Sequence, residues 1–215
     1  MKANDDVPYG TKRGDVSTRT AKGNETRQQI LAVAADLFHR QGVAATSPDQ
    51  IIEASGTGKG QFYHYFRNKE GLVHAVLQSY LDAIRNGGGP LNYEIASWED
   101  LERWFRAQLA LQKSYRMTRG CPFGTIGNEV TENDELIRQD LSLIFEVAKA
   151  KIAAFFIREK ASGRLDPQVR EEQLADFCLA MIQGAMLMGK VKRDSHLVEQ
   201  VVHETMAHLG GMRRP

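Results

Sequence analysis

Hydrophobic residues recur with the spacing of amphipathic helices from about Asn24 to the end of the chain. The first such stripe, which Gly42 ends, consists of Ile30, Leu31, Ala34, Ala35, Leu37 and Phe38. We find no segment with the strict apolar–polar alternation of a half-buried strand. The pattern therefore predicts an all-α fold with about nine helices.

Two short helices are predicted after the first one, and both have recognisable boundaries. Ser47 and Gln50 have the spacing of a capping box, and Pro48 occupies the first helical position. A turn over residues 56–58 leads into a helix that carries KGQFYHYF, and Asn68 then caps a long helix that NGGGP breaks. Two short helices joined by a glycine-containing turn, preceded by a longer one, indicate a helix–turn–helix unit.

The rest of the chain is also predicted to be helical. Ser97 caps the helix WEDLERWFRAQLALQKSYRM, and a short element follows GCP. Further helices are expected at roughly 133–161, at 168–191 and from about 195 to 210. By contrast, residues 1–23 are polar without apolar periodicity, so we expect a flexible arm. Its basic residues suit a minor groove, but a solvated tail is the more common role of such an arm.

Composition narrows the possible settings of this chain. It has 215 residues, a formal net charge of +1 and 42% hydrophobic residues, which suits one large domain or a small domain joined to a larger one. The sequence has no 18-residue apolar run and no signal-peptide pattern, so we expect neither a membrane span nor export. Two cysteines make no disulfide framework, which suggests free thiols in the cytoplasm.

The second short helix carries the candidate DNA-reading residues. In a helix–turn–helix, the N-terminal residues of the second helix enter the major groove. Here these residues are Lys59, Gly60 and Gln61. Glycine allows close approach of the backbones, glutamine pairs with a base edge, and lysine reaches guanine or phosphate. Thr46 and Ser47, at a helix N-terminus, suit a phosphate group.

The aromatic residues of KGQFYHYF separate by helical spacing. Phe62 and Phe66 are four residues apart and are expected to face the core. Tyr63 and His64 turn the other way, where their polar ends can bind phosphate oxygens, and Tyr65 is ambiguous. Two alternatives stay open, namely that all four aromatic rings are core or that they form a base-stacking platform. The platform is the weaker alternative, because single-strand binders usually place such rings on strands.

The segment TSPDQIIEASGTGKGQFYHYFRNKEGL resembles the DNA-binding domain of the tetracycline-repressor (TetR) family, and RQQILAVAADLFHRQGVAAT resembles that family's first helix. The similarity covers about residues 24–80, and KGQFYHYFRNKE matches the family pattern in order and spacing. One departure is Thr57, where family members often have a hydrophobic residue. By this resemblance, the positions expected near DNA are Thr46, Ser47, Lys59, Gly60, Gln61, Tyr63, His64 and Lys69.

The resemblance also implies a function. Family members are usually homodimeric transcriptional regulators, most often repressors, that bind a palindromic DNA operator and respond to a small-molecule effector without being enzymes. It implies a helix–turn–helix domain over 24–67 and a ligand-binding and dimerisation domain over 68–215, with 68–86 as the connecting helix. No cofactor is expected. The apolar segments 174–189 and 197–209 suit a four-helix dimer interface, and an intramolecular core is the alternative.

Aromatic, methionine and other apolar side chains of the predicted body are candidates for the wall of an effector cavity. Because few charged residues are expected to point inward, we predict an apolar or aromatic effector. The candidates are Trp104, Phe105, Gln108, Leu109, Tyr115, Cys121, Phe123, Ile126, Phe145, Phe177, Met181 and Met188.

Cys121 is the residue of the body with the most distinctive setting. It precedes Pro122 at a predicted helix start, with Arg116 and Arg119 close in sequence. Helix N–H groups and cationic side chains lower the pKa of a thiol and raise its reactivity, so one hypothesis is a sensor of electrophiles or oxidants. The alternative is a small capping residue that supports the pocket. Cys178, within an apolar helix, is predicted to be inert core.

Two further motifs do not support enzymatic chemistry. In HETMAH, His203 and His208 are five residues apart, whereas zinc-binding HExxH needs histidines four apart on one helix face. GTGKG lacks the spacing of a phosphate-binding loop and follows no predicted strand. An enzyme or carrier that uses the central cavity stays a distant alternative to a regulator.

Overall fold

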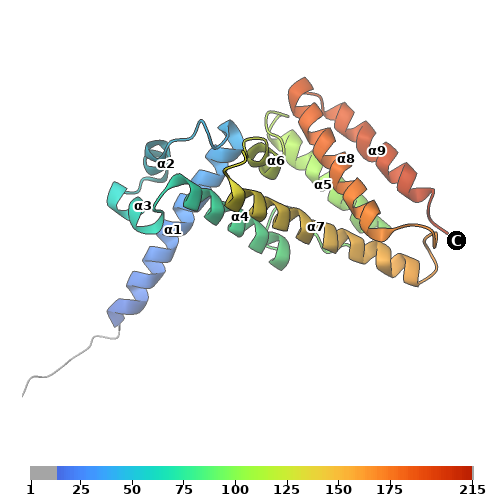
Figure 1. Ribbon diagram of the computed structural model, residues 1–215, viewed down its shortest axis with the longest axis horizontal. Helices are drawn as coiled ribbons and strands as arrows, with labels where there is room; N and C mark the ends of the chain where they lie inside the picture. The colour runs from blue at the N-terminus through green and yellow to red at the C-terminus, as the bar shows by residue number, and fades with distance from the viewer. Residues whose placement is uncertain (1–13, 215) are drawn as a thin grey trace, which may run out of the picture.

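The computed structural model describes residues 14–214, and within this range the chain forms nine α-helices and no β-sheet (Figure 1). The helices are α1 (Gly14–Gln41), α2 (Pro48–Ser55), α3 (Lys59–Tyr65), α4 (Lys69–Asn86), α5 (Trp98–Ser114), α6 (Pro122–Gly127), α7 (Glu135–Ala161), α8 (Glu171–Lys192) and α9 (Ser195–Gly210). The predicted all-α class and the number of helices are confirmed.

Helix α1 begins earlier than predicted. It starts at Gly14, so the expectation of a flexible arm up to residue 23 is wrong for the described part of that segment. Helix propagation costs less than nucleation, so a helix anchored by buried turns near Ile30 extends into polar sequence. The Tyr65 hydroxyl lies 3.1 Å from the position that a Cβ at Gly23 would occupy, so α1 passes close to α3 there. Residues 1–13 of the predicted arm lie outside the described range.

The first three helices form the predicted helix–turn–helix head at one end of the molecule (Figure 1). The capping box of α2 is present, because the Ser47 hydroxyl accepts from the Gln50 amide at 3.2 Å and the Gln50 side chain accepts from the Ser47 amide at 2.8 Å. Gly56 ends α2 in the left-handed conformation, with φ of 63°. Local sequence rules therefore predicted this head correctly.

Helix α4 leaves the head and packs along α7 in the body (Figure 1). A buried carboxylate links the two helices: Asp140 of α7 accepts from His74 Nδ1 at 2.6 Å and from Gln78 Nε2 at 2.8 Å, both on α4. A buried carboxylate is tolerated only with such partners. The contact fixes the connecting helix against the body at a defined register.

Helices α8 and α9 pack against each other, and α8 also packs against α7, so the two helices form one flank of the body (Figure 1). A Cβ at Gly189 would lie 2.6 Å from Val198 Cγ2, so only glycine allows this approach of α8 to α9. Among the described helices, α8 alone has the length and mean hydropathy of a membrane span. Packed core helices share these properties, and eight residues of α8, from Leu174 to Gly189, are buried against its neighbours.

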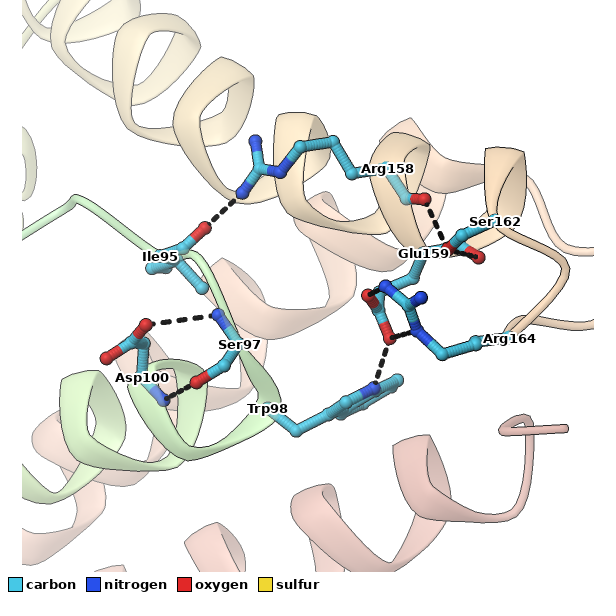
Figure 2. Close-up of polar contacts among 8 residues, drawn as sticks. All are labelled: Ile95, Ser97, Trp98, Asp100, Arg158, Glu159, Ser162 and Arg164. Atoms are coloured by element: carbon cyan, nitrogen blue, oxygen red, sulfur yellow. Dashed lines mark hydrogen bonds and ion pairs between the residues drawn. The ribbon is translucent and has the colours of Figure 1, made fainter. Parts of the chain in front are cut away.

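A polar cluster joins the start of α5 to the end of α7 (Figure 2). The indole N–H of Trp98 donates to Glu159 Oε2 at 2.8 Å, and the guanidinium of Arg164 donates to both oxygens of the same buried carboxylate. The Arg164 hydrogen bond, reinforced by the Trp98 N–H, holds the pKa of Glu159 below its usual value. This cluster therefore holds α5 and α7 together at the end of the body far from the head.

Candidate DNA-reading head and effector cavity

Helix α3 exposes the residues that were predicted to read DNA. The side chains of Phe62 and Phe66 are buried, as expected. The interpretation that every aromatic ring of this helix is core is wrong, because Tyr63 is exposed. Tyr65 is half-buried and packs against the core. The exposed positions of α3 are Lys59, Gly60, Gln61, Tyr63 and His64.

The two side chains predicted to read bases make weak contacts within the head. Lys59 Nζ pairs with Asp49 at 3.0 Å, and hydrogen bonding to Asp49 raises the pKa of Lys59. Both partners are exposed, and exposed ion pairs contribute little stability. The Gln61 side chain accepts from the Gly58 amide at 3.4 Å, a long hydrogen bond. Both side chains can therefore leave these partners for DNA at small cost.

The structure corrects one of the predicted phosphate contacts. The Thr46 side chain is fully buried, and its hydroxyl donates to the Gly42 carbonyl at 2.6 Å, so that hydroxyl does not face solvent. Ser47 is exposed at the N-terminus of α2. Lys69 is half-buried, and its Nζ donates to the Ala44 carbonyl at 3.3 Å. Ser47 and Lys69 stay candidates for phosphate contact.

We expect Gly60→Ala to separate DNA contact from stability. A Cβ at Gly60 would meet nothing within 4 Å, and alanine favours a helix over glycine by about 1 kcal/mol. The variant should therefore unfold at the same temperature or higher. Operator binding, measured by fluorescence anisotropy, should nevertheless weaken, because the added methyl group blocks close approach to the DNA. Unchanged operator affinity would show that Gly60 does not lie against DNA.

Behind the head, the body encloses an apolar cavity of about 70 Å³ between α4, α5, α6, α7 and α8. The connection between α4 and α5 covers part of it through residues 89–91 and Tyr93. On the other side lies an open groove of about 570 Å³ between α1, α6 and α8. Cys121, Phe145 and Gln183 line both spaces and form the wall between them.

Only some of the residues that were predicted to line the cavity do so. The predicted residues that line it are Trp104, Gln108, Cys121, Phe123 and Phe145. The others lie elsewhere: buried behind the wall, on the loop beside α1, or on α8 away from the cavity, where Phe177 packs against α9; they are Phe105, Leu109, Tyr115, Ile126, Phe177, Met181 and Met188. Sequence reasoning missed lining residues that include Tyr93, Gln112, Ile144, Ile182, Gln183 and Met186.

The prediction of a lowered pKa for Cys121 is wrong. The residue is the N-cap of α6, and hydrogen bonds from the amides of Gly124 and Phe123 favour its thiolate as expected. Burial outweighs them and raises the pKa of the thiol. Arg119 does not approach it but pairs with Asp36 at 2.8 Å. Burial also raises the pKa of Cys178, to about 12.

Two family models match the two parts of this architecture. Residues 30–76, which contain the head, match the model described as bacterial regulatory proteins of the tetR family. Residues 98–205, half of the chain, match the model of the tetracyclin repressor-like C-terminal domain. The chain belongs to the TetR family.

Curated relatives of the chain are transcriptional regulators, and a solved structure shares its fold. The chain is 29% identical over 180 residues to an uncharacterised HTH-type transcriptional regulator of Lactococcus lactis, covering 81% of this chain and 88% of the relative. It is 26% identical over 176 residues to the HTH-type transcriptional repressor DhaR of a Mycobacterium species, covering 81% and 87%. The crystal structure of a TetR-family regulator from Agrobacterium tumefaciens shares the fold, with a TM-score of 0.76, 20% identity, and coverage of 87% and 98%.

In this TetR-family chain, α6 and its flanking turns join the cavity to the head. His39 of α1 is buried, which lowers its pKa, and its Nε2 donates to the Gly120 carbonyl at 2.7 Å. The Glu129 carboxylate accepts from the Ala44 amide at 2.7 Å. No local sequence pattern predicts these contacts, because they depend on how α1 packs against the body.

Proposed function

We propose that this TetR-family protein is a ligand-responsive repressor that binds a palindromic operator as a homodimer in the cytoplasm. The observation that carries the proposal is the join between an exposed reading helix and an enclosed apolar cavity through α4 and α6. It acts without catalysis, cofactor or membrane, and an apolar or aromatic effector in the cavity releases it from DNA. Its similarity to a transcriptional regulator and to a transcriptional repressor supports this choice.

Dimerisation through α8 and α9 is supported by the outward face of α8. That face combines small residues with exposed apolar ones, and a Cβ at Gly184 would meet nothing within 4 Å. Exposed apolar patches of this kind mark interaction sites. In the proposed dimer, pairing two copies here brings the two reading heads to two half-sites about one DNA turn apart. The exposed residues of this face are Ala180, Gly184, Leu187, Met188 and Val191.

The effector acts by shifting α4. Helix α4 lines the cavity with Ala83 and Ile84 and begins beside the reading helix, so its displacement changes the separation of the two heads in a dimer. Coupling of this type is typically about 1–3 kcal/mol. An effector that binds without changing operator affinity would contradict this mechanism.

Operator selection from a random DNA pool with the purified protein tests the proposal. A palindromic consensus bound by a dimer in a gel shift supports a regulator, and the genes beside such sites indicate the effector. Failure to enrich any sequence would instead favour the alternative of an enzyme or carrier that uses the cavity.

We expect two substitutions in the head to change DNA binding in different ways. Gln61→Ala should relax operator specificity, because a base-reading group is lost. Lys69→Ala should weaken binding to all duplexes alike and flatten the salt dependence, because a phosphate contact is lost. Titration against operator and scrambled duplexes at several salt concentrations distinguishes the two. Equal losses on both duplexes for Gln61→Ala would contradict its role in base reading.

A further inference from the structure

Two buried polar atoms at the cavity lack a hydrogen bond of good geometry among the described residues, although one of them, on Trp104, interacts with the hydroxyl of Tyr93. They are the indole Nε1 of Trp104 and the carbonyl Oε1 of Gln112, in side chains that belong to residues only 2% and 1% exposed. Buried polar atoms are almost always hydrogen-bonded in native proteins. The other tryptophan of the chain follows this rule, because Trp98 donates to Glu159. The two residues that depart from this rule therefore line the same cavity.

The orientation of the Gln112 amide is fixed by its neighbour. Its Nε2 donates to the Gly120 carbonyl at 3.1 Å, the same oxygen that accepts from His39. The opposite orientation of the amide would bring two carbonyl oxygens together without a proton between them. The atom of Gln112 that lacks a good hydrogen bond is therefore an acceptor, whereas that of Trp104 is a donor.

The remaining polar groups of the cavity are neutral. Of the described residues that line it, none carries a charge, and the polar ones include Tyr93, Gln108 and Gln183. Burial raises the pKa of Tyr93 far above its usual value, so its hydroxyl stays neutral. A charged ligand group here would lose its water without gaining an opposite charge, which is strongly unfavourable.

We propose that the cavity takes a small uncharged molecule that accepts a hydrogen bond from Trp104 at one end and donates one to Gln112 at the other. This inference rests on the proposed function and narrows its effector from any apolar or aromatic molecule to one that also carries an uncharged acceptor and an uncharged donor. Hydroxy ketones and hydroxy amides have the required groups, whereas carboxylates, amines and hydrocarbons do not. The two residues lie on α5, eight positions or about 12 Å apart along the helix axis, so the ligand contacts them at two separate points of the cavity.

The size of the cavity limits this molecule. Its volume of about 70 Å³ is roughly half that of the engineered cavity that holds benzene. A compact ligand with few non-hydrogen atoms fits as the structure stands. A longer one requires displacement of residues 89–91, which lie in the irregular connection between α4 and α5 and line the cavity.

The test uses the purified full-length protein without DNA and a series of ω-hydroxy-2-alkanones about four to eight carbons long, a range that reaches toward the helical span of the two groups. Each is compared with the 2-alkanone that has methyl in place of hydroxyl and with the oxo-carboxylate of the same length. In calorimetry, the best hydroxy ketone should bind about tenfold more tightly than either match. Equal or tighter binding of the carboxylate, no advantage of the hydroxyl at any length, or no binding at about 10 mM would overturn the proposal.

Single substitutions test which residue makes each of the two ligand contacts. Gln112→Leu should reduce the affinity of the hydroxy ketone to that of the ketone while leaving the ketone unaffected. Trp104→Phe should weaken both, and Trp98→Phe, whose indole is bound to Glu159, should weaken neither. A hydroxy ketone that binds Gln112→Leu as tightly as the native protein would contradict the assignment.

A parallel gel shift with the selected operator separates this inference from the proposed function. Uncharged ligands that bind with the expected preference but leave the operator bound would contradict the proposed effector response and leave the ligand class standing. Release of the operator by a charged molecule that occupies the cavity would contradict the ligand class and leave the regulatory function standing.

Discussion

Replacing Leu187 and Val191 together with glutamate should abolish specific operator binding while each subunit stays folded. These side chains are 53% and 74% exposed on the outward face of α8, so they contribute little to the fold of one subunit. In a dimer they become buried, and a buried charge without a partner is strongly unfavourable. A monomer contacts one half-site, so we expect the preference for operator over random DNA, about a thousandfold or more in a specific complex, to be lost.

Sedimentation and operator titration measure this prediction together. The matched control is Ile157→Glu on α7, because Ile157 is also apolar and 51% exposed but lies on a different helix. The control should sediment and bind DNA as the native protein does. If the double variant still forms dimers, or if the control loses them as well, the α8 face is not the specific dimer contact.

The boundaries of the helices were predictable because they depend on neighbouring residues. Ser47, Asn68 and Ser97 cap α2, α4 and α5 through side chains that accept from amides three residues further on. Such contacts require no knowledge of the tertiary structure. The start of α1 was wrong for the converse reason, because its N-terminal turns lack the apolar period that sequence reasoning uses.

The cavity wall was harder to predict, because an apolar helix does not reveal which of its faces meets the core. Met186 lines the cavity, whereas Met188 on the same helix is exposed on its outer side. Gln112, one turn after the predicted Gln108, was missed because the sequence alone does not show how far along α5 the cavity extends. The predictions for Thr46 and Cys121 share a further error. The position of each residue beside a helix N-terminus was predicted correctly, but the burial of its side chain was not.

Glu159→Ala should destabilise the protein by about 2–3 kcal/mol, which is large for one residue outside the proposed sites. The carboxylate is buried and accepts from Trp98 and Arg164, so its removal leaves the Trp98 N–H without its acceptor (Figure 2). Arg164 is more than half exposed and regains water, which limits the loss. Urea denaturation of both proteins at neutral pH measures the difference.

A double-mutant cycle isolates the contribution of the indole. In the Trp98→Phe background no N–H is left unsatisfied, so Glu159→Ala should cost less there, by about 1 kcal/mol. Additive effects of the two substitutions would contradict the importance of this hydrogen bond. Trp104→Phe provides a comparison, because the Trp104 N–H makes no hydrogen bond of good geometry within the described residues, so its loss should cost little stability.

The effect of Glu159 should also depend on pH with a defined sign. Its pKa is lowered in the folded state by hydrogen bonding to Arg164 and Trp98, against a usual value of 4.5. The ionised carboxylate therefore contributes its full stabilisation above pH 4.5 and loses it as the pH falls through the lower, folded-state pKa. Glu159→Gln keeps an acceptor for Trp98 but removes the charge, so its cost in urea denaturation should be present at neutral pH and should shrink at about pH 3. A cost that stays constant over this range would show that the charge of Glu159 does not stabilise the fold.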